Sequence, residues 1–152
     1  MSFCKKRKYK TDYENVTIKV NKDHPLVFGL DKVNINKTVY VLEGPIDSMF
    51  IDNSISVGGS DFKRISNITT KENFVMVYDN QPRNIQLVNT MQEMINKGYR
   101  VVIWPDFIKE KDINEMILAG KSVDEVFKII NENACSTLQA NLRLKEWRKI
   151  NA

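Results

Sequence analysis

Two carboxylates in the chain each follow directly on a short apolar run. Val39–Leu42 ends in Glu43, and Phe74–Tyr78 ends in Asp79. Apolar runs of this length between polar or turn residues are typical of buried strands. In open α/β sheets, ligand sites form at the carboxyl ends of the strands. The pattern therefore predicts two acids at a common ligand-binding edge.

Two acids brought together in this way form a hard-oxygen site. One or two carboxylates usually hold Mg²⁺ together with retained waters and substrate phosphates. An ion held there can neutralise a phosphoryl oxygen and orient a nucleophile. Glu43 is alternatively a general acid or base, if its surroundings raise its pKa. Asp47 is the next candidate, although an acid in the first turn of a helix beginning at Pro45 also interacts favourably with the helix dipole.

The hydrophobic pattern indicates strands that alternate with helices. Core strands are expected at Val39–Leu42, Ile55–Gly59, Phe74–Asp79 and Arg100–Pro105, and a strand with one solvent-facing side at Val16–Val20. Helices are expected at about 45–51, 83–97, 111–119 and 123–133, with a last helix starting at Ser136. This alternation predicts an α/β fold with a mostly parallel four-stranded sheet flanked by helices on both faces.

Apolar residues at helical spacing predict which side of each helix packs against the sheet. In the helix at 45–51, the residues expected to face the sheet are Ile46, Met49 and Phe50. In the last helix, the expected apolar stripe consists of Leu138, Leu142 and Trp147. Ser122 and Glu125 have the spacing of a capping box at the start of the helix at 123–133.

Composition places the chain among ordinary soluble proteins. Its 152 residues suffice for one domain with a packed core, and 42% of them are hydrophobic and 28% charged. No apolar run approaches the roughly 18 residues needed to span a bilayer. Cys4 and Cys135 are far apart and there is a single histidine, so no zinc motif is indicated and a reducing, intracellular compartment is expected.

Basic residues gather towards both ends of a chain whose net charge is +4. The first cluster contains Lys5, Lys6, Arg7, Lys8 and Lys10, and the second contains Arg143, Lys145, Arg148 and Lys149. Such clusters can contact nucleic-acid phosphates by releasing counterions. A solvated tail and a solvated helix face are the alternative interpretation.

The segment Glu43-Gly44-Pro45-Ile46-Asp47, placed after an apolar strand, resembles the E-G-x-x-D motif of the Toprim domain. That domain is shared by bacterial-type primases, type IA and type II topoisomerases, overcoming-lysogenization-defect nucleases and recombination-repair proteins. Three further segments resemble the primase branch, namely Phe28–Asp31, Asn53–Gly58 and Lys111–Glu115. The order of these motifs is most similar to that in the primases of tailed bacteriophages.

The resemblance implies a metal site made of one glutamate and a D-x-D pair, which bind Mg²⁺ or Mn²⁺. Glu43 matches the glutamate and Asp79 the first aspartate, so these two are the expected catalytic and metal-binding residues. Gln81 stands in place of the second aspartate and offers an amide oxygen that carries no charge. Asp112, from the K-D element, ranks above Asp106 as a compensating ligand.

The resemblance also implies a division of the chain. The expected units are a basic flexible tail at 1–15, an N-terminal extension at 16–36, a Toprim domain at 37–120 and a C-terminal helical extension at 121–152. Further motif residues are Gly44, Asp47 and Gly58. The residues expected to bind nucleic acid are Lys5, Lys6, Arg7, Lys8 and Lys111. The stretch before Lys37 has no cysteine-rich motif, so the zinc-binding module of such primases is not expected in it.

The function implied is that of the Toprim module of a phage-type DNA primase, which makes RNA primers on single-stranded DNA. The expected partners are template and nucleotides, together with a replicative helicase or a separate zinc-module primase subunit. The expected compartment is the cytoplasm of a bacterial host, with no membrane association. The alternatives are a Toprim nuclease, which would use the same acids, and a non-catalytic nucleic-acid-binding protein in which Gln81 marks a degraded metal site.

Overall fold

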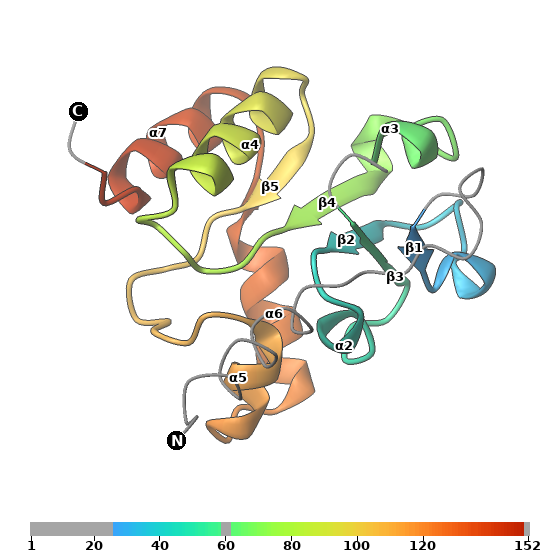
Figure 1. The fold of residues 1–152 in the computed structure, drawn as a ribbon, viewed down its shortest axis with the longest axis horizontal. Helices are drawn as coiled ribbons and strands as arrows, with labels where there is room; N and C mark the ends of the chain where they lie inside the picture. The colour runs from blue at the N-terminus through green and yellow to red at the C-terminus, as the bar shows by residue number, and fades with distance from the viewer. Residues whose placement is uncertain (1–25, 59–61, 151–152) are drawn as a thin grey trace, which may run out of the picture.

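The structure, a computed structural model, describes residues 26–58 and 62–150 of the chain. These residues form one six-stranded sheet with helices on both faces (Figure 1). The strands are β1 (Val27–Phe28), β2 (Val39–Leu42), β3 (Ser54–Val57), β4 (Phe74–Val77), β5 (Arg100–Val102) and β6 (Ala134–Cys135). Their order across the sheet is β1-β3-β2-β4-β5-β6. The four central strands run parallel, whereas β1 and β6 are antiparallel to their neighbours.

The helices lie in two layers. They are α2 (Pro45–Ser48), α3 (Phe62–Ile65), α4 (Ile85–Asn96), α5 (Ile113–Leu118), α6 (Val123–Asn133) and α7 (Thr137–Trp147), with short 3-10 turns at Leu30–Lys32 and Lys71–Asn73. α4 and α7 pack side by side over one face of the sheet, and α5 and α6 cover the other (Figure 1). No helix within the described ranges has the length and apolar character needed to cross a membrane.

The central strands are buried on both faces, which is why their sequences are continuous apolar runs. Alternate residues of a strand point to opposite faces. Val41 and Met76 pack in the layer under α4 and α7, while Leu42 and Val77 pack against α5 and α6. Leu42 lies opposite Val77 in the parallel β2–β4 pair, so the chain leaves both strands at the same edge of the sheet. The positions of Glu43 and Asp79 follow from this register.

The predicted parallel core is present, but the predicted count of four strands is wrong. The antiparallel strands β1 and β6 extend the four parallel strands on either side, so the sheet is mixed. Each of these edge strands has two residues, which is too short to produce a period in the sequence. The strand expected at Val16–Val20 lies outside the described residues. The architecture is an α/β fold that is compatible with a Toprim-like arrangement.

The predicted buried face of α2 is wrong at two of its three residues. Ile46 and Met49 are 59% and 72% exposed, while Phe50 packs partly against the core. The buried residue of α2 is Ser48. Its carbonyl accepts a hydrogen bond from Ser54 Oγ (2.7 Å), which holds this side of the single-turn helix toward β3.

The predicted apolar stripe of α7 is also largely wrong. Leu138 and Leu142 are exposed, and the buried side consists of Ala140, Leu144 and Trp147. These three residues are spaced four and three apart and therefore share one face of the helix. That face packs in the same core layer as the buried residues of α4, and the two helices contact each other.

Helix starts were predicted better than short helix faces. The capping box of α6 is confirmed, because Glu125 N donates to Ser122 Oγ and Ser122 N donates to Glu125 Oε2. α4 begins after Asn84, whose Oδ1 accepts a hydrogen bond from Leu87 N (3.2 Å).

Candidate functional site

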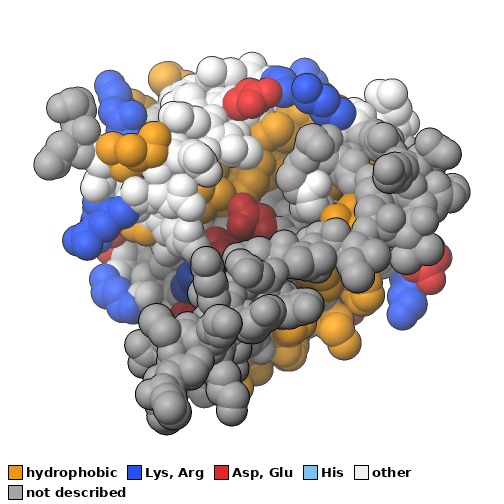
Figure 2. All heavy atoms as spheres, in the orientation of Figure 1, with side chains coloured by type: hydrophobic (Ala, Val, Ile, Leu, Met, Phe, Trp, Pro, Cys, Tyr) orange, Lys and Arg blue, Asp and Glu red, His pale blue; other side chains and the backbone are white. Residues whose placement is uncertain are grey.

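Four carboxylates line one small hollow at the carboxyl edge of the parallel strands. They come from Glu43 after β2, Asp47 in α2, Asp79 after β4 and Asp112 before α5. We call this site the acidic hollow. Figure 2 shows acidic side chains recessed near the middle of the face that carries this edge. The predicted acids are thus brought together from three segments of the chain, since Glu43 and Asp47 belong to one of them.

Glu43 has the most perturbed carboxyl of the hollow. Partial burial of the carboxyl and the negative charges of Asp79 and Asp47 raise the pKa of Glu43 to about 7, against a smaller lowering by the Lys111 charge. The side chain keeps a large contact with solvent, which limits the desolvation and leaves the carboxyl open to exchange protons with water. Glu43 therefore changes its charge near neutral pH.

Asp79 is held between two donors. Lys111 Nζ lies 3.3 Å from Asp79 Oδ2, and Gln81 Nε2 donates to the same oxygen over 3.3 Å. Partial burial still raises the pKa of Asp79, while the Lys111 contact lowers it. Gln81 Oε1, the atom that would bind a metal, accepts a hydrogen bond from Asn84 Nδ2 (3.0 Å). The amide of Gln81 thus faces Asp79 with its nitrogen and Asn84 with its oxygen.

Asp47 and Gly44 are explained by packing. Asp47 Oδ1 accepts a hydrogen bond from Asn114 N (2.8 Å), so Asp47 joins α2 to the start of α5. A Cβ atom on Gly44 would lie 2.5 Å from Asp47 Oδ2, which is closer than the two atoms can approach. The glycine of the motif therefore makes room for the aspartate three residues later.

The other predicted site residues take different places. Asp112 caps α5, since its Oδ1 accepts a hydrogen bond from Glu115 N (2.8 Å), and its Oδ2 lies 3.9 Å from Lys111 Nζ. Asp106 borders another hollow, away from the four acids. Gly58 lies at the end of β3, where a Cβ atom would come within 2.9 Å of Leu26.

The residues predicted to bind nucleic acid are only partly visible. Lys5, Lys6, Arg7 and Lys8 lie outside the residues that the structure describes. Lys111 is described, and its ammonium group lies against Asp79 at the rim of the acidic hollow. Its position suits contact with a phosphate bound there, although the ion pair already engages it.

Asn80 is a residue that the sequence interpretation missed. Its Nδ2 donates to the carbonyls of Ile108 (3.0 Å) and Glu110 (3.1 Å), and its backbone N–H donates to Lys111 O (2.6 Å). Its Oδ1 accepts a hydrogen bond from Trp147 Nε1 (3.2 Å). Asn80 thus fastens the segment that carries Lys111 to the end of β4. An amide between Asp79 and Gln81 gives no sequence signal for such a contact.

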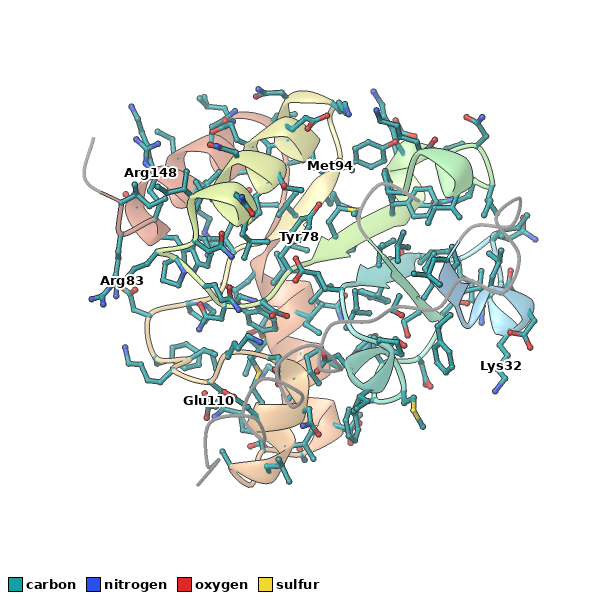
Figure 3. All side chains as sticks on the ribbon, in the orientation of Figure 1. Lys32, Tyr78, Arg83, Met94, Glu110 and Arg148 are labelled. Carbon is teal, nitrogen blue, oxygen red and sulfur yellow. The ribbon has the colours of Figure 1, made fainter. Side chains whose placement is uncertain are left out.

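A groove of about 520 Å³ opens beside Glu43 between the sheet, α3 and α4. Its apolar lining comes from Val41, Val57, Phe62, Met76, Leu87 and Met94, and its polar lining includes Lys63, Thr90 and Lys97. Tyr78 at the end of β4 and Met94 on α4 both border it (Figure 3). Burial raises the pKa of the Tyr78 phenol, so the hydroxyl stays protonated. The groove offers flat, mostly apolar contact next to the acids.

The acidic hollow has donor atoms suited to Mg²⁺ or Mn²⁺ but no closed cage. Within the described ranges, no three Asp, Glu, His or Cys side chains converge closely enough to hold a metal ion. Mg²⁺, however, commonly keeps several waters and binds through one or two carboxylates. Burial and the repulsion by Asp79 and Asp47 raise the pKa of Glu43, and a divalent cation would relieve the repulsion. The residues therefore fit a loosely held, water-rich ion.

The fold and the hollow together describe an α/β protein with acids at the carboxyl edge of parallel strands, and its fold is compatible with a Toprim-like arrangement. No family model matches the chain. A DNA primase of Enterobacteria phage T4 is 33% identical to it over 137 residues, which cover 89% of this chain and 40% of that primase. The chain thus spans about two fifths of the length of this relative. The similarity supports a relationship between this chain and part of that phage primase.

Proposed function

We propose that the chain is the catalytic module of a phage-type DNA primase, which makes RNA primers on single-stranded DNA with the help of Mg²⁺ or Mn²⁺. The acidic hollow carries this proposal. Glu43 and Asp79 follow two adjacent parallel strands, and they are close enough for the charge of Asp79 to raise the pKa of Glu43. The similarity to part of the phage T4 primase supports the same assignment.

Each part of the hollow has a role in this proposal. Glu43 and Asp79 would hold the ion, with Asp112 and the amide of Gln81 as assisting ligands. A bound ion would neutralise the phosphate oxygens of a nucleotide and orient them. Lys111 would contact a phosphate at the rim. The groove beside Glu43 would receive the nucleoside, whose flat base suits an apolar lining with aromatic rings.

Calorimetric titration with Mg²⁺ tests the metal site. We expect weak binding by the wild type and a loss of about tenfold or more in affinity for Glu43→Gln, because a ligand charge is removed. Glu132→Gln is the matched control, since Glu132 is an exposed glutamate on α6 that pairs with Lys128. Absence of Mg²⁺ binding by the wild type, or equal affinity in Glu43→Gln, would contradict the proposed site.

The reaction class is tested with two substrates. Incubation with single-stranded template and ribonucleotides should give short RNA products, with a zinc-module primase subunit added if the chain alone is silent. Incubation with plasmid should leave the DNA intact. Metal-dependent plasmid cleavage without RNA synthesis would instead assign the acids to a Toprim nuclease.

A second candidate is a non-catalytic nucleic-acid-binding protein. The observation in its favour concerns Gln81 and Asp79, the residues at the two positions of the D-x-D pair. Gln81 brings no charge and its Oε1 is engaged by Asn84, while Lys111 already neutralises Asp79. Such a protein would bind single-stranded DNA equally well with Mg²⁺ and with EDTA, and it would make no primers under any condition.

A further inference from the structure

A second hollow begins at Gln81, two residues after Asp79 of the acidic hollow. It has a volume of about 570 Å³ and is lined by Gln81, Pro82, Arg83, Asn84 and Lys149. Gln81 connects the two sites, because it lines this second hollow while its Nε2 donates to Asp79 Oδ2. Only the Gln81 side chain therefore lies between a polymer bound in the second hollow and the carboxylate of Asp79.

The cations of this region are available to bind a ligand. Arg83, Arg148 and Lys149 are exposed, and none of their side chains forms an ion pair in the part of the chain that the structure describes. Figure 3 shows Arg83 and Arg148 on the same margin of the molecule, and Figure 2 shows Lys and Arg side chains along it. By contrast, the lysines at 97, 111, 121 and 128 each face a carboxylate within 4 Å.

The backbone holds these cations together although they are far apart in sequence. Lys149 N donates a hydrogen bond to Pro82 O (2.8 Å), which fixes the segment after α7 to the loop before α4. Trp147 Nε1 donates to Asn80 Oδ1, which fixes the end of α7 to the end of β4. These two hydrogen bonds thus connect the segments that carry the cations to the segment that carries Asp79.

The same surface continues on the other side of Pro82. Pro82 and Lys149 also border a smaller hollow of about 140 Å³, where Lys109 adds a further cation and Asp106 an acid. Lys109 Nζ donates to the backbone carbonyl of Asp106 rather than to its carboxylate. The two hollows together form a continuous strip with an excess of positive charge.

We propose that Arg83, Arg148 and Lys149 form a phosphate-binding surface for a single nucleic-acid strand that leads into the acidic hollow. A series of cations beside a cluster of acids suits a strand whose outer phosphates pair with the cations and whose end meets the acids. The proposal that the strand leads to the acids rests on the proposed function. The binding of phosphates to the three cations does not.

Fluorescence anisotropy with labelled oligo(dT) in EDTA tests the surface. We expect the triple variant Arg83→Gln/Arg148→Gln/Lys149→Gln to lose affinity by about tenfold or more, and its dependence of log K on log salt to become shallower by about 0.7 for each lost contact. The matched control removes the same charge elsewhere, in Lys32→Gln/Lys37→Gln/Lys128→Gln, and should lose much less. Equal losses in both triple variants, or no loss in the first, would overturn the proposal.

Four further measurements complete the test. Circular dichroism should show the first triple variant folded, since its three side chains are exposed, and Arg83→Glu alone should reproduce part of the loss. Glu43→Gln, measured in EDTA above pH 7, should bind oligo(dT) more tightly if the strand passes the acids, and an unchanged affinity would overturn this path. Preferential binding to anionic phospholipid vesicles over oligo(dT) would overturn the nucleic-acid assignment.

Measuring oligonucleotide binding in EDTA makes the test of the cationic surface independent of the test of the metal site. The three cations are tested without any divalent ion, so a failed Mg²⁺ titration leaves the oligonucleotide result intact. Conversely, a normal Mg²⁺ affinity in the triple variant, combined with unchanged oligonucleotide binding, would retain the acidic site and reject the cationic surface.

Discussion

The acids of the hollow carry more negative charge than their neighbours neutralise. Glu43, Asp47 and Asp79 all have a raised pKa, and partial burial is the largest cause in each case. Charges of nearby carboxylates raise all three further, and Lys111 offsets part of this for Glu43 and Asp79. At the scale of single residues, the site is therefore adapted to receive positive charge.

Glu43→Gln should stabilise the metal-free protein at high pH. The folded-state pKa of about 7 lies above the value of about 4.3 for an unfolded chain, so the folded state binds the additional proton between these values. Stability from this group is present below about pH 4 and is lost as the pH rises through about 7. Because the side chain is exposed, the gain of the variant above pH 7 should be only about 1 kcal/mol.

Urea unfolding in EDTA at about pH 5 and about pH 8 measures this difference. Glu132→Gln serves as the control, since Glu132 is exposed at the protein surface. A gain of the same size at both pH values would show that burial and repulsion do not raise the pKa of Glu43.

Gln81→Asp should strengthen metal binding and weaken the metal-free fold. The change adds a charge to the donors near Asp79 and should raise the Mg²⁺ affinity by about tenfold. In EDTA the same change replaces the Gln81 hydrogen bond to Asp79 by repulsion, at a cost of about 1 kcal/mol. Calorimetry and urea unfolding measure the two effects. Gln81→Asn, which stays neutral, should leave the metal affinity low, and an equal rise in both variants would argue against a charge effect.

At the scale of elements, the loop between β2 and α2 is built around the Gly44–Asp47 contact. Gly44→Ala should push the Asp47 carboxylate away and break its hydrogen bond to Asn114 N, at a cost of about 1–3 kcal/mol. Asp47→Ala should cost a similar amount. The double variant should cost less than the sum of the two, because the added methyl then meets no carboxylate. Urea unfolding of all four proteins tests this, and strict additivity would show that the contact does not matter.

The sequence predicted those elements whose patterns are long or local. α4 was recognisable from Leu87, Met91 and Met94 at helical spacing, and α6 from its capping box, because both signals lie within one segment. The faces of α2 and α7 were misjudged because the side that is buried depends on partners elsewhere in the chain. The edge strands were too short to be seen.

The acidic hollow could also be predicted only in part from the sequence. Glu43 and Asp79 each follow a recognisable strand, so their meeting at one edge could be inferred from parallel pairing. The contact between Lys111 and Asp79 joins residues that are 32 positions apart in the sequence. It depends on the hydrogen bonds by which Asn80 holds the Lys111 segment. The unpaired state of Arg83 and Lys149 likewise depends on tertiary packing. No local pattern reveals such contacts.

At the scale of the whole molecule, the described sheet ends on both sides in a strand of two residues. Short edges offer few free backbone groups to another chain and so disfavour uncontrolled pairing. β6 closes one of these edges, and its Cys135 thiol is buried against Val101 O (3.8 Å). Burial also raises the pKa of the Cys135 thiol.

The reactivity of the Cys135 thiol therefore reports how often this edge of the sheet opens. In a Cys4→Ser background, labelling by a thiol reagent such as DTNB should be slow in the native protein, since the thiolate is scarce and shielded. The rate should rise at urea concentrations below the global transition if β6 detaches before the parallel core unfolds. A native rate equal to that of the urea-unfolded chain would contradict this. The labelling half-time then reports how often the sheet opens at β6.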